Sequence, residues 1–260
     1  MQRIKFTVAY DGTLYSGWQV QAHLGEQPPT IQGELEKRFA RIIGEPVIVH
    51  GAGRTDAGVH ADAQVFHCDI PLHRADFDWQ KALNATLPHD IRITAQAPVS
   101  AKFHARKSAL KKRYAYSLWS APQGAMPRLY PYVWSTPPLD MPLMLEAAAH
   151  LVGTRDFKSL QNSGSQVTTT VRTLHAITPH PARAGSLVCP ETWPVVTWIA
   201  EGNGFLRQMV RNMMGLLVWV GRKKIPPDAV PRILLACDRK ALVSPTAPAQ
   251  GLTLLDVGYE

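Results

Sequence analysis

The sequence contains few cysteines and no long apolar run. Its 260 residues include three cysteines, Cys68, Cys189 and Cys237, which lie far apart and form no C-x-x-C pair. This pattern argues against a disulfide framework or a zinc finger, and it favours a reduced, cytoplasmic setting. No apolar segment reaches the roughly 18 residues of a membrane-spanning helix. The first ten residues lack the apolar core of a secretion signal and the Arg/Ser-rich pattern of a transit peptide. We therefore expect a cytoplasmic protein that does not enter a membrane.

The chain also lacks the composition of a disordered protein. Hydrophobic residues make up 45% of it and charged residues 18%, and disorder requires low hydrophobicity with high net charge. A length of 260 residues fits one large domain or two smaller ones.

Positive charge is concentrated in the second part of the chain. Residues 1–105 hold 10 Lys/Arg and 11 Asp/Glu, a net charge of −1, whereas residues 106–260 hold 18 and 9, a net charge of +9. Such an excess suggests a polyanionic partner, most simply a nucleic acid. By charge alone, a merely basic soluble protein remains an alternative.

Local patterns in the first 105 residues alternate between strands and helices. Every second residue from Ile4 to Tyr10 has a large apolar side chain, which is typical of a half-buried strand. A helix is expected after Thr30, a good N-cap, and before Gly44, a good C-terminal stop. The predicted elements are a strand at 3–10, a helix at 30–43, strands at 47–50 and 64–69, a helix at 77–87 and a strand at 91–96. This β-α-β-β-α-β order is the split-βαβ plan of a ferredoxin-like unit.

The second part has elements of the same kinds. Strands are predicted at 113–119, 171–178, 195–201 and 252–257, and helices at 140–151, 205–220 and 226–236. The Pro-rich stretches 122–142 and 179–194 are interpreted as insertion loops rather than domain linkers. We expect an α+β protein with an N-terminal half at 1–105 and a basic C-terminal half at 106–260.

The segment Gly51–Ala61 reads G-A-G-R-T-D-A-G-V-H-A. Its glycines allow a tight loop whose backbone approaches a ligand. It has neither the Lys-Ser/Thr of a phosphate-binding P-loop nor the spacing of a dinucleotide fingerprint. Arg54 and Asp56 are the charged residues of this loop, and an Asp in such a turn can equally be a simple backbone cap.

Two further segments combine positive charge with aromatic or apolar residues. Five positive charges from Arg106 to Arg113, which we call the basic tract, lead directly into Tyr114. This pattern suits either phosphate neutralisation with base stacking or a solvated loop before a core strand. Arg211 stands in an otherwise apolar helical stretch, so its side chain either extends to solvent or pairs with a buried carboxylate. The ten histidines show no recognised metal-ligand spacing, so no metal site is predicted.

Nine blocks in the sequence together resemble the tRNA pseudouridine synthase A family. The blocks are V-A-Y-D-G-T from Val8, S-G-W-Q from Ser16, I-Q-G-E-L-E from Ile31, G-R-T-D-A-G-V-H-A from Gly53, N-A-T-L-P-H-D-I-R-I from Asn84, F-H-A-R from Phe103, K-R-Y-A-Y from Lys112, G-F-L-R-Q-M-V-R-N-M-M-G from Gly204 and P-A-Q-G-L-T-L-L-D-V-G-Y from Pro248. They follow the family order and cover nearly the whole chain, and the block around Asp56 is the most specific.

The resemblance implies an isomerase that converts uridine to pseudouridine at positions 38, 39 and 40 of the tRNA anticodon stem-loop. The reaction breaks the bond from C1′ to N1, turns the base and joins C1′ to C5, and it consumes no cofactor. Asp56 matches the family's catalytic carboxylate and would act as a nucleophile or a base. Arg54 would organise the loop, Arg211 would pair with the Asp and keep it ionised, and Tyr114 would stack on the target uracil. Substrate contacts are also expected from Gly251 and Leu252, which match the segment lining the pocket, and from His60, Arg106, Lys111, Lys112 and Arg113.

The implied fold is a pair of ferredoxin-like halves joined into one extended, mostly antiparallel sheet, with helices on one face and the catalytic cleft between the halves. The family acts as a homodimer on one tRNA, so tRNA and a second copy of the chain are the expected partners, with no membrane, metal or cofactor. The alternatives are a tRNA-binding protein of the same fold without activity, a base- or sugar-cleaving enzyme, and an enzyme acting on small nucleotides. The presence of Arg54 and Asp56 disfavours an inactive tRNA-binding protein, and the basic tract disfavours an enzyme acting on small nucleotides. Only a product assay distinguishes a base- or sugar-cleaving enzyme from a pseudouridine synthase.

Overall fold

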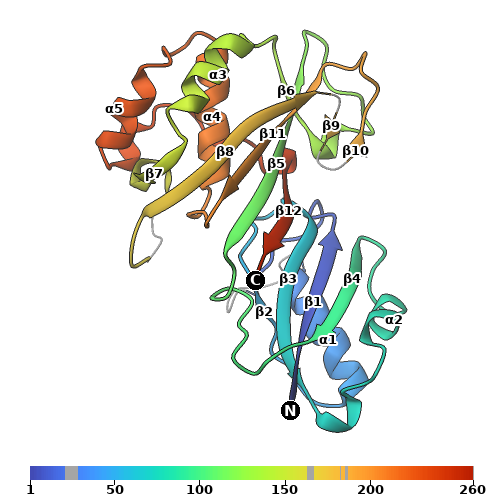
Figure 1. Ribbon diagram of the computed structural model, residues 1–260. Helices are drawn as coiled ribbons and strands as arrows, with labels where there is room; N and C mark the ends of the chain where they lie inside the picture. Colours follow the sequence, from blue (N-terminus) through green and yellow to red (C-terminus); the bar gives the residue numbers. More distant parts are fainter. Residues whose placement is uncertain (21–28, 163–166, 182, 185–186, 260) are drawn as a thin grey trace. The chain divides into compact units, whose positions relative to one another are not determined.

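The computed structural model describes residues 1–20, 29–162, 167–181, 183–184 and 187–259 (Figure 1). They form two compact units. The first unit comprises Met1–Leu110 and the C-terminal segment from Leu254, and the second comprises Lys111–Thr253. Within these ranges no helix is both long enough and apolar enough to span a membrane.

The first unit follows the β-α-β-β-α-β order that the sequence predicts. Its elements are β1 (Gln2–Tyr10), α1 (Ile31–Ile43), β2 (His50–Gly51), β3 (His60–Ile70), α2 (Trp79–Asn84) and β4 (Ile91–Pro98), with a short 3₁₀ turn at Leu72–Arg74. The strands lie in the order β4-β1-β3-β2 and pair antiparallel. This arrangement is the split-βαβ plan.

The core of the first unit lies between its sheet and its two helices. Alternate residues of β1 are buried, as the period-two pattern predicts. Phe39 of α1 contacts Phe6 of β1, Phe66 of β3 and Trp79 of α2, with ring centroids 5.4–6.2 Å apart. Both helices therefore cover the same face of this sheet (Figure 1).

The second unit is larger and carries the longer helices. Its elements are β5 (Lys111–Ser120), β6 (Trp134–Thr136), α3 (Met141–Ala149), β7 (Gly153–Asp156), β8 (Val171–Pro181), β9 (Arg183–Ala184), β10 (Leu187–Val188), β11 (Val195–Gly202), α4 (Met209–Gly221) and α5 (Ala229–Leu235). The last strand, β12 (Leu252–Gly258), begins in this unit and belongs to the first unit from Leu254 onward. The other strands of the second unit lie in the order β5-β11-β8-β7, with β6 parallel to β5, while β9 and β10 form a separate pair. Both units combine helices with mostly antiparallel strands, so the predicted α+β class is confirmed.

Strand β5 and helix α4 form the centre of the second unit. Six consecutive residues of β5, Tyr114–Trp119, are buried, which is expected of a strand covered on both faces. The buried hydroxyls of Ser117 and Thr197 bond to each other at 2.8 Å between β5 and β11. Almost every residue of α4 is buried as well, so α4 is a core helix rather than a surface one.

Several predicted boundaries are wrong, and the structure shows why. The segment 47–50 is not a strand, except at His50, because α1 side chains satisfy its backbone: Val49 N–H donates to Glu36 Oε1 at 3.0 Å, and Gln32 Nε2 donates to Val49 O at 3.2 Å. The helix predicted at 205–220 begins at Met209, because Gln208 has a left-handed backbone with φ of 60°. The helix predicted at 77–87 is confined to Trp79–Asn84. The two insertion loops contain the short strands β6, β9 and β10.

Candidate active site

The Gly-rich segment connects β2 to β3, with Asp56 at the start of a tight turn. Ala52 N–H donates to Val65 O at 2.7 Å, and Gln64 Nε2 donates to Gly53 O at 2.9 Å. Val59 N–H closes the turn by donating to the carbonyl of Asp56 at 3.2 Å. We call residues 52–59 the Asp56 loop.

A second loop, Asp11–Trp18, packs directly against the Asp56 loop. Trp18 N–H donates to Thr55 O at 3.1 Å, and the approach leaves no room for side chains at two glycines. A Cβ on Gly12 would lie 2.0 Å from Val59 O, and one on Gly17 would lie 2.6 Å from Thr55 O. Gly17 also has a φ of +91°, which favours glycine. We call residues 11–18 the bracing loop.

Buried side chains connect these two loops to the sheet. The hydroxyls of Tyr10 and Thr55 bond at 2.9 Å. His60, which is 5% exposed, accepts the N–H of Gly12 on Nδ1 at 3.2 Å. The structure thus places His60, a predicted substrate contact, beneath the bracing loop. Arg54 is exposed and Asp56 is half-buried, so both lie at the surface of the first unit.

In the second unit, Arg211 lies on α4 against the segment before β12. Its Nε donates to Ala247 O at 2.8 Å, and Ala247 N–H donates back to Arg211 O at 3.1 Å. The next helical residue, the buried Asn212, accepts the Thr246 hydroxyl at 2.7 Å and donates to Leu160 O at 2.8 Å. Arg211 is therefore a half-buried cation held by backbone oxygen, not a side chain that simply extends into solvent.

The residues Gly251 and Leu252 are buried, and Gly251 lies against Tyr116 of β5. The Tyr116 hydroxyl donates to Pro248 O at 2.8 Å, and a Cβ on Gly251 would lie 2.7 Å from the Tyr116 ring. Burial raises the pKa of the Tyr116 phenol well above its ordinary value. The pattern of alternating side chains on β5 does not identify this contact, because the partner segment lies 132 residues away.

The predicted stacking residue, Tyr114, and the last three charges of the basic tract, Lys111–Arg113, occupy the first residues of β5. Tyr114 is 8% exposed, and Phe205 meets its ring edge to face at 5.2 Å. Glu201 of β11 lies opposite Arg113 in the sheet. The Glu201 carboxylate lies 3.4 Å from Arg113 Nε and 3.7 Å from Lys111 Nζ. Sequence reasoning missed this acidic partner of the tract, because it lies on another strand.

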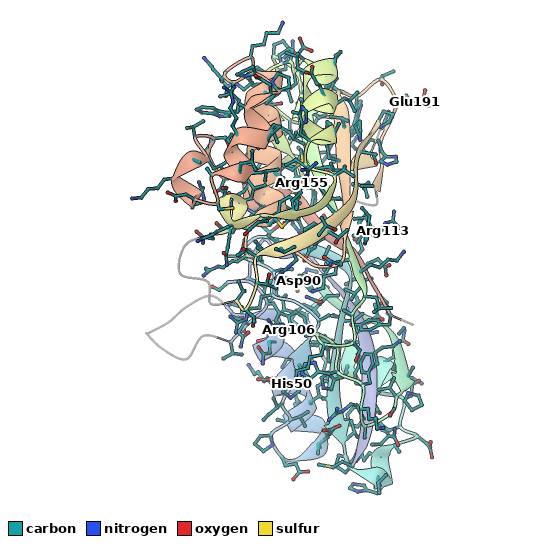
Figure 2. The ribbon with its side chains drawn as sticks, turned by 60° about the vertical axis from the view of Figure 1, so that its left-hand side comes forward. His50, Asp90, Arg106, Arg113, Arg155 and Glu191 are labelled. Carbon is teal, nitrogen blue, oxygen red and sulfur yellow. The ribbon has the colours of Figure 1, made fainter. Side chains whose placement is uncertain are left out.

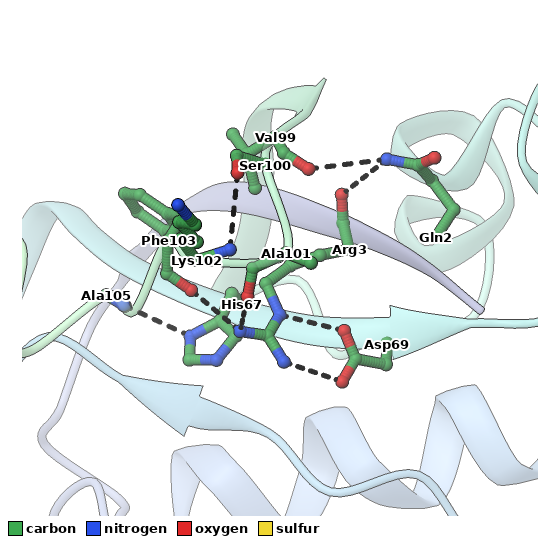
Figure 3. Close-up of polar contacts among 10 residues, drawn as sticks. All are labelled: Gln2, Arg3, His67, Asp69, Val99, Ser100, Ala101, Lys102, Phe103 and Ala105. Carbon is green, nitrogen blue, oxygen red and sulfur yellow. Dashed lines mark hydrogen bonds and ion pairs between the residues drawn. The ribbon is translucent and has the colours of Figure 1, made fainter.

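A separate network in the first unit shapes the turn that carries Arg106 (Figure 3). The Arg3 guanidinium donates to both carboxylate oxygens of Asp69 at 2.8 Å, and its Nη1 donates to Ala101 O and Phe103 O at 2.7 and 2.8 Å. A bidentate pair of this kind fixes the guanidinium plane. Arg106 itself is exposed (Figure 2).

Two histidines hold the same turn through their ring nitrogens. His67 Nδ1 accepts Ala105 N–H at 3.1 Å, and His104 Nδ1 accepts Arg106 N–H at 3.2 Å. Burial, with positive charge nearby, lowers the pKa of His67 to about 4. His50, His67 and His104 lie within ring-contact distance of one another, but no group of three or more potential metal ligands is found among the described residues.

The chain is similar to a known protein family and to curated proteins over most or all of its length. A family model described as tRNA pseudouridine synthase matches residues 7–106 and 147–260. A tRNA pseudouridine synthase A from Nitratidesulfovibrio vulgaris (strain DSM 19637 / Miyazaki F) is 51% identical over 278 residues, with 100% of both chains covered. The protein of that name from Lawsonia intracellularis (strain PHE/MN1-00) is 51% identical over 260 residues, again with 100% of both covered. This chain belongs to the tRNA pseudouridine synthase family.

Membership in the pseudouridine synthase family confirms the resemblance read from the sequence and the prediction of an isomerase. A more distant relative, the tRNA pseudouridine synthase A of Coxiella burnetii (strain Dugway 5J108-111), is 39% identical over 259 residues, which are 100% of this chain and 94% of the relative. The family match includes Arg54, Asp56, Arg106 and Arg211, whereas the rest of the basic tract and Tyr114 lie outside its two ranges.

Proposed function

We propose that the chain converts uridine to pseudouridine in the anticodon stem-loop of tRNA, at positions 38, 39 and 40. The observation that carries this proposal is the family match over the G-R-T-D segment, in a loop whose backbone is fixed by two neighbouring segments. The reaction detaches the base from C1′ at N1 and rejoins it at C5. C5 releases its hydrogen to solvent as a proton and N1 takes up a proton, so the product is an isomer of uridine. No oxidant, reductant or group donor is consumed, and the proposal includes no cofactor.

Asp56 supplies the reactive carboxylate in this proposal. Cleavage of a glycosidic bond builds positive charge at C1′, and a carboxylate can stabilise that charge, trap it or remove a neighbouring proton. Half-burial of Asp56 supports this role, since a carboxylate at the surface of a fixed loop can reach a nucleotide without reorganising the protein. In the same proposal, Arg211 pairs with this carboxylate.

The target uridine must leave its stack before Asp56 can reach C1′. Unstacking costs a few kcal/mol, and we assign the compensating contacts to Arg54, Tyr114 and the pocket segment at Gly251 and Leu252. An exposed Arg54 suits contact with the flipped-out nucleotide, and the ring of Tyr114 is held in place by Phe205. Stacking of a base on an aromatic ring contributes about 1–3 kcal/mol.

The basic second half of the chain provides the phosphate contacts. Residues 106–260 carry a net charge of +9, and we assign tRNA phosphates to Arg106, Lys111, Lys112 and Arg113. We further propose that the protein acts in the cytoplasm as a homodimer bound to one tRNA, as the family resemblance implies. Light scattering of the purified chain, free and with tRNA, tests the dimer directly, and a monomeric mass in both would contradict it.

The target positions are tested by mapping pseudouridine in three tRNA transcripts, each with a single uridine at position 38, 39 or 40. Carbodiimide modification followed by primer extension locates each product. Product at all three positions supports the proposal, while product confined to another part of the tRNA would contradict it. Tight tRNA binding without product would favour a non-catalytic binding protein of the same fold, and base release without rejoining would favour a cleaving enzyme.

A further inference from the structure

Tyr15, in the bracing loop, links the Asp56 loop to a distant part of the first unit. Its side chain is 6% exposed, and its hydroxyl donates to Asp90 Oδ1 at 2.7 Å. Its backbone carbonyl accepts the N–H of Gly58 in the Asp56 loop at 3.4 Å. One residue thus contacts the Asp56 loop through its backbone and Asp90 through its side chain.

Hydrogen bonds to Pro88 O fix the backbone of the turn that contains Asp90. Asp90 lies in the turn before β4, where Ile91 N–H donates to Pro88 O at 3.1 Å and Arg92 Nη1 donates to the same oxygen at 2.7 Å. The Asp90 carbonyl also accepts the N–H of Asp11, the first residue of the bracing loop, at 2.9 Å. Asp90 therefore holds the bracing loop at its start through its backbone and at Tyr15 through its side chain.

We propose that Tyr15 and Asp90 are a positioning pair that keeps the Asp56 loop in its reactive conformation. This inference rests on the proposed role of Asp56 and adds two residues that act through that loop without touching the substrate. The hydrogen bond is short, has an acidic partner and is partly buried. Burial and the Asp90 hydrogen bond both raise the pKa of the Tyr15 phenol, so it stays a protonated donor.

The consequence of breaking the pair follows from the geometry of the bracing loop. Without the hydrogen bond from Tyr15 to the Asp90 side chain, the bracing loop keeps its backbone bonds to Thr55 and Asp90. The Tyr15 carbonyl, which accepts Gly58 N–H, is then no longer fixed by the Tyr15 side chain. Gly58 has a φ of +76° at the second residue after Asp56, so rotation there moves the carboxylate. A catalytic group displaced by about 1 Å can lose a hundredfold in rate. Binding of tRNA, which depends on phosphate contacts, is not expected to change.

The test compares Tyr15→Phe, Asp90→Ala and the double variant in single-turnover pseudouridine formation at saturating enzyme. We expect each single change to lower the rate about tenfold, as for a lost hydrogen bond to a charged group, with tRNA Kd within twofold. The double variant should be no slower than the slower single variant, because both remove the same interaction. Asp90→Asn keeps an oxygen acceptor and should retain at least a third of the wild-type rate.

Gln96→Ala is the matched control, because it weakens the same unit away from both loops. Gln96 Oε1 accepts Gln80 N–H at 2.7 Å, and its Nε2 donates to Phe77 O at 3.3 Å. It should lower the melting temperature and leave the rate unchanged. Hydrogen exchange at Gly58 N–H should accelerate in Tyr15→Phe and stay unchanged in Gln96→Ala.

Three results would overturn the positioning pair: a wild-type rate in Tyr15→Phe, losses that multiply in the double variant, or an equal loss in Gln96→Ala. Asp56→Asn, assayed in parallel, separates this failure from that of the proposed function. If Asp56→Asn is inactive while Tyr15→Phe is fully active, only the positioning pair fails. If Asp56→Asn remains active, the proposed role of Asp56 fails.

Discussion

The Asp56 loop and the basic tract are held in place by different forces. Backbone amides and neutral hydroxyls fix the loop, including the bonds of Thr55 to Trp18 and Tyr10. Residues Lys111–Arg113 of the tract lie on a regular strand, and the charges of Lys111 and Arg113 face the carboxylate of Glu201. Neutral hydrogen bonds are short-ranged and directional, while exposed ion pairs are weak and screened by salt.

This difference is consistent with the separate tasks that we propose for the two regions. A group that reacts must be held to a fraction of an ångström, which the close-packed loop provides. A group that binds phosphate can act at longer range and with less exact geometry. Changes in the Asp56 loop should therefore alter the rate of the saturated enzyme, and changes in the tract should alter affinity and its dependence on salt.

Among variants that keep Asp56, the largest effect is expected from Gly12→Ala, which tests whether the Asp56 loop controls the rate but not the affinity. The new Cβ would lie 2.0 Å from Val59 O, so one of the two loops must move. We expect the single-turnover rate to fall about a hundredfold, with tRNA Kd nearly unchanged. Gly124→Ala is the control, because no atom lies within 4 Å of its added Cβ. A higher tRNA Kd with an unchanged rate in Gly12→Ala would show that this loop controls affinity rather than rate.

The turn that carries Arg106 should make the first unit sensitive to acid. The folded pKa of His67 is about 4 against 6.5 for the free side chain, so between these values the unfolded chain binds a proton that the folded chain does not. Stability is therefore full above about pH 6.5 and is lost as the pH falls toward 4. We expect a loss of about 2 kcal/mol, or roughly thirtyfold in the folding equilibrium.

Urea unfolding of the wild type, His67→Gln and His73→Gln at pH 7, 5.5 and 4.5 measures this effect. His67→Gln should be less stable at pH 7 and should lose less on acidification. His73 is exposed in the same unit, so its variant should follow the wild type. Equal acid sensitivity in all three proteins would show that His67 does not control the stability of this unit.

Loss of charge in the basic tract should weaken binding without slowing the reaction. We expect Lys111→Ala with Lys112→Ala to raise tRNA Kd about tenfold and to reduce the slope of log K against log salt by up to about two. Filter binding between 50 and 300 mM KCl measures both. Lys37→Ala with Lys81→Ala removes the same charge from exposed sites of the first unit and should change the slope less. A lower rate at saturating enzyme in the Lys111→Ala, Lys112→Ala variant would contradict the proposal that the tract controls affinity and not rate.

The smallest expected effect is a gain in affinity. Glu201→Gln removes the carboxylate facing Lys111 and Arg113, so both cations become more available to phosphate. The pairs are partly exposed, and we expect tRNA Kd to fall only about threefold at low salt. Glu146→Gln, an exposed glutamate of the same unit, is the charge-matched control. Weaker binding in Glu201→Gln would show that Glu201 orders the tract rather than competing for it.

Elements with strong local signals could be predicted from the sequence alone. Helix α1 begins after Thr30, whose hydroxyl accepts Gly33 N–H at 3.2 Å, and ends at Gly44 with φ of 91°. Both ends depend on chemistry within one turn of the helix. The predicted start of α4 at residue 205 is wrong. The helix begins at Met209, because Gln208 adopts a left-handed backbone that nothing in the local sequence indicates.

The residues of the candidate site were predictable to the extent that they lie in one motif. Asp56 and Arg54 are found in a single Gly-rich segment. The partners that shape the site come from remote segments. Glu201 faces Lys111 and Arg113, which precede it by 90 and 88 positions in the sequence. Asp90 accepts a hydrogen bond from Tyr15, which precedes it by 75 positions. Such pairings depend on sheet order and register, which local periodicity does not encode.

The central claim is that Asp56 performs the chemistry and contributes little to tRNA binding. The most direct measurement is C5 tritium release from tRNA by Asp56→Asn at saturating enzyme, with Kd measured by filter binding on the same preparation. We predict a rate at least about a thousandfold below the wild type, with Kd within threefold. A variant that retained a tenth of the wild-type rate, or that lost affinity while turning over normally, would contradict the account.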